Sequence, residues 1–96
     1  MNVVLLDEAE QDLLDGRTFY EQRERGLGAY FLDSMFADLR SLALHAGVHA
    51  KLFGYHRALA RRFPFAIYYR VVRKVVRVYA VLDCRRDPAW IRQRLD

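Results

Sequence analysis

The first half of the chain has a hydrophobic pattern that predicts one short strand and then a helix. The apolar run at residues 3–6 ends at Asp7 and is typical of a buried strand. We expect Asp7 to cap the helix, because acidic residues are favoured at a helix N-terminus. The apolar side of the helix should contain Ala9, Leu13, Leu14 and Tyr20. The segment Gly26-Leu27-Gly28 ends it.

A second helix follows this glycine turn. Its apolar residues recur at steps of three and four, the period of one buried helical face: Leu32, Met35, Phe36, Leu39, Leu42, Ala43 and Ala46. Gly47 ends it. Because only a short turn joins the two helices, they should pack antiparallel as a hairpin.

From residue 51 the hydrophobic period changes to two, which predicts strands. The alternating segments are residues 55–62, 65–71 and 76–82, rich in β-branched and aromatic residues. In the last segment, one face should carry Val76, Val78, Ala80 and Leu82, and the other Arg77, Tyr79 and Val81. The three strands are close enough in sequence to form an antiparallel meander. The Arg73-Lys74 turn contains neither Gly nor Asn, so its type stays open.

A short last helix is expected after Asp87, which caps it, with Pro88 at the first position. Trp90 should fix this helix to the core, while Phe63 and Phe65 should anchor the sheet to the helical hairpin. The predicted fold is α+β, with element order β-α-α-β-β-β-α in one domain, residues 1–96. An N-terminal strand and a helical hairpin pack on a three- to four-stranded antiparallel sheet, whose other face is partly open.

Composition limits the function classes. With 53% hydrophobic and 29% charged residues, the chain is globular and not disordered. No apolar stretch approaches the roughly 20 residues that span a bilayer, so no membrane association is expected. The single cysteine, Cys84, excludes an internal disulfide and fits a reducing cytoplasm. Residues 1–50 carry four arginines against nine acidic residues, whereas residues 51–96 carry twelve Lys and Arg against three acidic residues. Such a basic half favours an anionic partner, although a merely solvated face is an equal alternative.

The histidines, the cysteine and the tyrosines that could act as metal ligands, nucleophile or base-stacking groups are better explained as residues that pack within the fold. His45 and His49 have the spacing of metal ligands on a helix, but Gly47 lies between them and nothing completes a site, so no metal is expected. Cys84 has no evident base in sequence to activate it as a nucleophile. Tyr68, Tyr69 and Tyr79 lie among arginines, as in base-stacking surfaces, but packing within the sheet is the preferred interpretation. No cofactor is expected.

Several motifs together resemble one family. They are Gly26-Leu27-Gly28-Ala29-Tyr30-Phe31, Tyr55-His56-Arg57, the stretch from Arg61 to Arg70 with its Phe63-Pro64-Phe65 centre, Val78-Tyr79-Ala80-Val81-Leu82, and Arg85-Arg86-Asp87-Pro88-Ala89-Trp90. Over nearly the whole chain this pattern resembles the RelE/ParE superfamily, the toxins of type II toxin–antitoxin modules. The resemblance implies a small cytoplasmic protein that arrests growth when free. A cognate acidic, ParD-like antitoxin would neutralise it in a hetero-oligomeric complex.

The superfamily contains two activities, and the sequence leans towards one of them. RelE-like members cut mRNA on the ribosome, and in such a nuclease His56 would serve as base with Arg61, Arg70 and Arg77 at the phosphate. The C-terminal His or Tyr of those nucleases is absent after Trp90. Some of them also have a lysine-rich active patch, which is missing here because Lys51 is the only lysine before the strands. The interpretation is therefore a ParE-like toxin that binds and inhibits DNA gyrase, with no catalytic residues. A third alternative is a non-toxic relative that only binds its partner.

The same resemblance implies a binding surface built from arginines. The candidates for contacting the antitoxin or the target are Arg57, Arg61, Arg62, Arg70, Arg77, Arg85 and Arg86. Arg85 and Arg86 precede a helix cap, so they are expected to be exposed.

Overall fold

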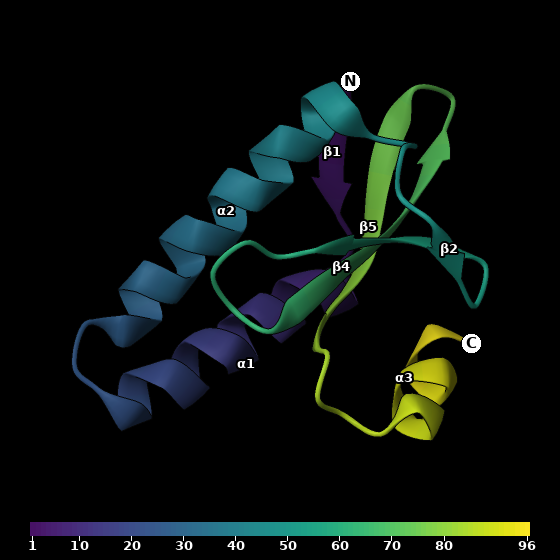
Figure 1. The fold of residues 1–96 in the computed structure, drawn as a ribbon. Helices are drawn as coiled ribbons and strands as arrows, with labels where there is room; N and C mark the ends of the chain where they lie inside the picture. The colour runs from purple at the N-terminus through teal and green to yellow at the C-terminus, as the bar shows by residue number, and fades with distance from the viewer.

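The computed structural model describes residues 1–96 as one five-stranded sheet and three helices. In chain order the elements are β1 (Asn2–Leu5), α1 (Asp7–Arg23), α2 (Leu27–His45), β2 (Lys51–Leu52), β3 (Tyr55–Leu59), β4 (Phe65–Val72), β5 (Val75–Asp83) and α3 (Pro88–Leu95). The strand order in the sheet is β1-β5-β4-β3-β2. Helices α1 and α2 form the hairpin on one side of the sheet (Figure 1), and α3 packs on the other face. The predicted α+β class is confirmed.

Strand β1 joins the sheet at one edge and runs parallel to β5. Val3 pairs with Val76 and Leu5 with Val78, whereas all other neighbouring strands pair antiparallel. The short strand β2, which the pattern did not reveal, extends the opposite edge, so the sheet is mixed and has five strands. An edge strand lacks a neighbour on one side. The predicted burial of β1 is therefore wrong: its residues are exposed or half-buried, and Val4 is 44% exposed.

Two glycines allow the helices of the hairpin to approach closely. The ring of Phe31 in α2 lies against Gly16 of α1, where an added Cβ would sit 2.6 Å from it. Gly28 in α2 lies against the carbonyl oxygen of Arg17 in α1, where an added Cβ would be at 2.7 Å. The predicted antiparallel hairpin is confirmed, and its contact depends on these two missing side chains.

The helix ends differ in part from the prediction. Leu6 rather than Asp7 occupies the N-cap of α1, and no side chain caps this end. For α2 the cap comes from the other helix, because the Glu21 carboxylate accepts hydrogen bonds from the backbone N–H groups of Gly26 and Gly28, each at 3.0 Å. These bonds lower the pKa of Glu21 below its ordinary value. This helix-to-helix cap fixes the turn geometry of the hairpin.

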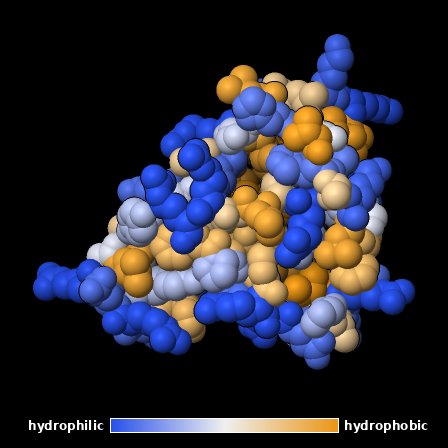
Figure 2. All heavy atoms as spheres, in the orientation of Figure 1, coloured by the Kyte–Doolittle hydropathy of each residue, from blue (hydrophilic) through white to orange (hydrophobic).

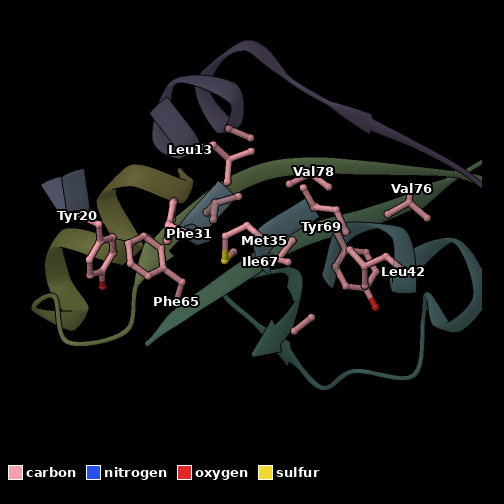
Figure 3. Close-up of a cluster of buried hydrophobic side chains, with 14 residues drawn as sticks. Leu13, Tyr20, Phe31, Met35, Leu42, Phe65, Ile67, Tyr69, Val76 and Val78 are labelled. Atoms are coloured by element: carbon pink, nitrogen blue, oxygen red, sulfur yellow. The ribbon is translucent and has the colours of Figure 1, made fainter. Parts of the chain in front are cut away.

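The main core fills the space between the helical hairpin and the sheet. Figure 3 shows side chains of this core, including Phe31 and Met35 from α2 with Ile67 and Tyr69 from β4. Phe65 is 8% exposed, and its ring centroid lies 5.0 Å from that of Phe31, which confirms its predicted anchoring role. Two predicted core residues are instead on the surface of the hairpin, since Leu14 is 44% and Phe36 40% exposed.

A second, smaller core lies on the opposite face of the sheet. Its buried members are Tyr55, Ala66, Tyr68, Ala80, Leu82, Ile91 and Leu95. Asp87 caps α3 as predicted, accepting a hydrogen bond from the backbone N–H of Ala89 at 3.0 Å. Helix α3 covers part of the face, and the hydroxyl of Tyr55 donates to the carbonyl of Leu95 at 2.9 Å. The predicted anchor Trp90 is 38% exposed, so Ile91 and Leu95 fix the helix instead.

A β-bulge in β5 changes which side chains share a face. Tyr68 pairs with Ala80, whereas its neighbour Tyr69 pairs with Val78, so Tyr79 is the extra residue. As a result Val78 and Val81 belong to the main core, while Ala80 belongs to the smaller one. The prediction that Val76, Val78, Ala80 and Leu82 share one face is therefore wrong beyond the bulge, because an inserted residue reverses the alternation.

Candidate macromolecule-binding face of the sheet

The face of the sheet opposite α1 and α2, here called the outer face, carries three of the predicted binding arginines. They are Arg57 on β3, Arg70 on β4 and Arg77 on β5. Successive side chains of a strand point to opposite faces of the sheet. Each of these arginines directly follows or precedes a residue of the main core, such as Ala58 or Val76, and therefore lies on the outer face.

Arg70 and Arg77 are directly opposite each other on neighbouring strands. The guanidinium of Arg70 lies 4.1 Å from the ring centroid of Tyr55 and 5.4 Å from that of Tyr79, and its Nε donates to the carbonyl of Gly54 at 3.2 Å. The three ion pairs of the protein involve other cations: Arg85 with Asp83, and Arg94 with both Glu8 and Asp12. Arg70 and Arg77 are thus exposed cations without a carboxylate partner, which makes them available to an external anion.

Arg57 is more constrained. Its Nε donates to the hydroxyl of Tyr68 at 3.3 Å, and its Nη2 lies 3.5 Å from the Sγ of Cys84. The hydrogen bond to Tyr68 is the main cause that raises the pKa of the guanidinium above its ordinary value. Arg57 is half-buried, so it can present only part of its guanidinium to a partner.

Arg61 and Arg62 lie outside the strands, in the connection between β3 and β4. The prediction extended the strand to residue 62, but β3 ends at Leu59. Both arginines are exposed, and the backbone N–H of Arg61 donates to the carboxylate of Asp38 on α2 at 3.2 Å. Asp38 is only 9% exposed, and nothing in the apolar periodicity of α2 indicated a buried carboxylate there.

Arg85 and Arg86 are exposed as predicted, but both have partners within the chain. Arg85 forms an ion pair with Asp83 at 2.6 Å, which holds the pKa of that carboxyl below its ordinary value. The guanidinium of Arg86 stacks over the ring of Trp90, 4.1 Å from its centroid. A partner that used these two side chains would compete with those contacts.

The residues considered for RNA cleavage are not brought together. His56 points to the hairpin side of the sheet, where its ring stacks on Tyr69 with the centroids 5.0 Å apart. Its Nδ1 lies 2.7 Å from the carbonyl oxygen of His49, so this nitrogen is the donor in that bond. Arg70 and Arg77 are on the outer face, and the sheet separates them from His56. His56 is therefore not paired with Arg70 or Arg77 across one pocket.

His49, Tyr69 and His56 form a polar cluster at the end of α2 that sequence reasoning missed. The hydroxyl of Tyr69 accepts from the backbone N–H of Gly47 at 2.9 Å and lies 2.5 Å from Nδ1 of His49. Burial, followed by the neighbouring charges of His56 and His45, lowers the pKa of His49. No group of three His, Cys, Asp or Glu side chains in the protein could hold a metal ion. His45 is exposed, whereas His49 is half-buried beside Tyr69.

An open groove of about 720 Å³ lies between α1, β5 and α3. Carboxylates line much of it, including Glu8, Asp12 and Asp15, and Arg94 pairs with the first two. The groove has more acidic than basic side chains, whereas the exposed Arg70 and Arg77 make the outer face basic. None of the three helices combines the length and apolar composition that a bilayer-spanning segment needs.

Comparisons with known proteins identify the fold. A scan against models of known protein families finds no match, and a search of curated proteins finds none either. Among solved structures, one described as "Chromosomal ParDE TA system from P. aeruginosa" is similar, with a TM-score of 0.71 and 17% sequence identity. The alignment covers 84% of this chain and 92% of that chain. The protein therefore has the ParE-like fold that the motif pattern predicted.

Proposed function

We propose that this protein is the toxin of a type II toxin–antitoxin module, of the ParE kind, which arrests growth by binding and inhibiting DNA gyrase. The observation that carries the proposal is the ParE-like fold, found in a structure described as a ParDE toxin–antitoxin system. The exposed cations of the sheet, Arg70 and Arg77, support it, because they offer a positively charged surface to a partner.

The proposed partner in the resting state is an acidic, ParD-like antitoxin in a hetero-oligomeric complex in the cytoplasm. Between Leu39 and Leu82 the chain has nine lysines and arginines and no acidic residue. The positive charge of this region attracts an acidic segment of the antitoxin over long range. The rate of complex formation should therefore fall steeply with added salt. A flat salt response would argue against this role of the basic region.

A supercoiling assay with purified gyrase tests the target. The wild-type chain should inhibit supercoiling and trap DNA breaks, and the antitoxin should reverse both effects. Arg70→Gln/Arg77→Gln should weaken inhibition, whereas Arg17→Gln/Arg25→Gln, which removes the same charge from the hairpin, should not. Neither inhibition nor trapped breaks at saturating protein would refute gyrase as the target.

The mRNA-interferase alternative has less support, because His56 and the arginines of the outer face lie on opposite sides of the sheet. Ribosome toeprinting distinguishes the two activities. Codon-positioned cuts that disappear in Arg61→Ala or Arg77→Ala would favour the nuclease. Normal growth after induction of the chain alone would favour the non-toxic relative.

A further inference from the structure

The connection between α2 and β2, residues 46–50, is here called the connecting segment. Of its residues only Ala46 and His49 are half-buried, and Val48 is 77% exposed. Burial of apolar side chains therefore does little to hold the segment in place. Figure 1 shows it leaving the end of α2 and passing to β2, and Figure 2 shows hydrophobic and hydrophilic side chains mixed on the surface at that end of the molecule.

Three hydrogen bonds of side chains hold the connecting segment against β3 and β4. The hydroxyl of Tyr69 accepts from the backbone N–H of Gly47 at 2.9 Å and lies 2.5 Å from Nδ1 of His49. The Nδ1 of His56 donates to the carbonyl of His49 at 2.7 Å. Two of these bonds meet at the hydroxyl of Tyr69, whose side chain is fully buried. The segment therefore depends on how this hydroxyl is satisfied.

The single hydrogen of the Tyr69 hydroxyl decides the protonation state of His49. The hydroxyl accepts from Gly47, and Nδ1 of His49 is the only acceptor within reach of its own hydrogen. A neutral imidazole has one acceptor nitrogen, so His49 satisfies the hydroxyl when it is neutral and carries its hydrogen on Nε2. A protonated His49 has a hydrogen on Nδ1 as well. The buried hydroxyl hydrogen is then left without a partner, which is unfavourable.

The charges around His49 act in the same direction. The titratable side chains near it are those of His45 at the end of α2, His56 on β3 and Tyr69 on β4, and Lys51 on β2 is paired with His56. Burial, followed by the positive charges of His56 and His45, lowers the pKa of His49 below its ordinary value of 6.5. No ion pair of the protein includes a histidine, and residues 40–81 contain no acidic residue. A positive charge on His49 is therefore not compensated by a carboxylate.

We infer that His49 is a pH-sensitive latch, which holds the connecting segment on Tyr69 while it is neutral and releases the segment when it is protonated. Because the closed segment favours the neutral imidazole, its stability is complete above the ordinary pKa of 6.5 and is lost as the pH falls through the lower pKa of the folded state. Release would leave β2 attached to the sheet through two residue pairs with β3. The latch goes beyond the proposed function, and the isolated chain is enough to test it.

The experiment is an NMR titration of the full chain between about pH 8 and about pH 4.5. The side-chain signals of the histidines give the midpoint of each titration. Hydrogen exchange of the Gly47 amide, expressed as protection relative to an unstructured chain, measures opening of the connecting segment. We expect His49 to titrate below 6.5 and the protection of Gly47 to fall as His49 becomes protonated. The fall should be about tenfold for each pH unit between the midpoint of His49 in the closed segment and that in the open one.

Two variants separate the latch from a purely structural role of these side chains. His49→Asn places an amide oxygen, which does not titrate, near the position of Nδ1, so it should make the protection of Gly47 independent of pH. Tyr69→Phe keeps the ring and removes the hydroxyl, so Gly47 should lose protection throughout and the midpoint of His49 should rise. The control His45→Gln removes an exposed histidine from the end of α2 and should retain the pH-dependent loss.

Three results would overturn the inference. The first is protection of Gly47 in the wild type that does not change with pH. The second is a pH-dependent loss that persists in His49→Asn, because another group would then be the sensor. The third is an equal loss of protection in the amides of β4 at the same pH, which would show unfolding of the whole chain and not release of one segment.

Discussion

Replacement of Arg94 by methionine should destabilise the protein mainly at neutral pH. Arg94 on α3 donates to the carboxylate of Asp12 on α1 at 2.6 Å, and that same carboxylate accepts the backbone N–H of Val81 on β5 at 3.0 Å. The two side chains are 20% and 14% exposed. Breaking a fully buried ion pair costs about 3–5 kcal/mol. Because this pair is partly solvated and Asp12 keeps its bond to Val81, we expect a loss of about 2–3 kcal/mol.

The cost should depend on pH in a defined direction. Burial raises the pKa of Asp12 above its ordinary value of 3.8, and the bond from Val81 and the charge of Arg94 oppose this rise. Removal of Arg94 raises the pKa of Asp12 further. A carboxyl with a raised pKa in the folded state favours folding when protonated, and this advantage is lost as the pH rises through that pKa. The penalty of Arg94→Met should therefore shrink as the pH falls towards 3.8.

Urea unfolding of the wild type and the variant at about pH 7 and about pH 4.5 measures this difference. The double variant Asp12→Asn/Arg94→Met is the control. It removes the buried charge and keeps an amide oxygen for Val81, so it should recover most of the lost stability at neutral pH. An equal penalty at both pH values, or no recovery in the double variant, would show that Arg94 acts through packing and not through Asp12.

Three further predictions concern the helical hairpin and its contact with the sheet. Phe65→Ala should lower the free energy of unfolding by about 3–5 kcal/mol, as a cavity opens beside Phe31; a marginal loss in urea unfolding would place Phe65 outside the core. Gly28→Ala should lower the thermal midpoint, because the new Cβ would meet the carbonyl of Arg17 at 2.7 Å; an unchanged midpoint would mean that the helices shift freely. Glu21→Gln should be costly at neutral pH and nearly neutral in acid, since a lowered pKa gives stability that is present above the ordinary value of 4.5 and lost as the pH falls through the folded pKa; a cost independent of pH, from the same unfolding curves, would contradict the charge-assisted cap.

The candidate binding surface was only partly predictable. Arg70 and Arg77 were expected on one surface with the other arginines, and they do share the outer face. From the sequence, His56 was grouped with Arg70 and Arg77 in a candidate nuclease site, whereas the sheet separates them in the structure. The internal partners of Arg57, Arg85 and Arg86 were not predicted either. Those partners, Cys84, Asp83 and Trp90, depend on how β5 enters the last turn and α3. Only the contact of Arg57 with Cys84 joins distant parts of the chain, since the other two pairs are two and four residues apart.

Sequence periodicity determined the three helices and all strands except β2, because burial of one face imposes a period of 3.6 or 2 on each. These elements gave the α+β class, and the count of charged residues gave the basic second half. The tertiary structure alone decided that β1 pairs parallel to β5, that Tyr79 forms a bulge, and that Asp12 joins three elements. These features arise between residues far apart in the chain, where pairing and packing are chosen by the whole fold and leave no periodic trace in the sequence.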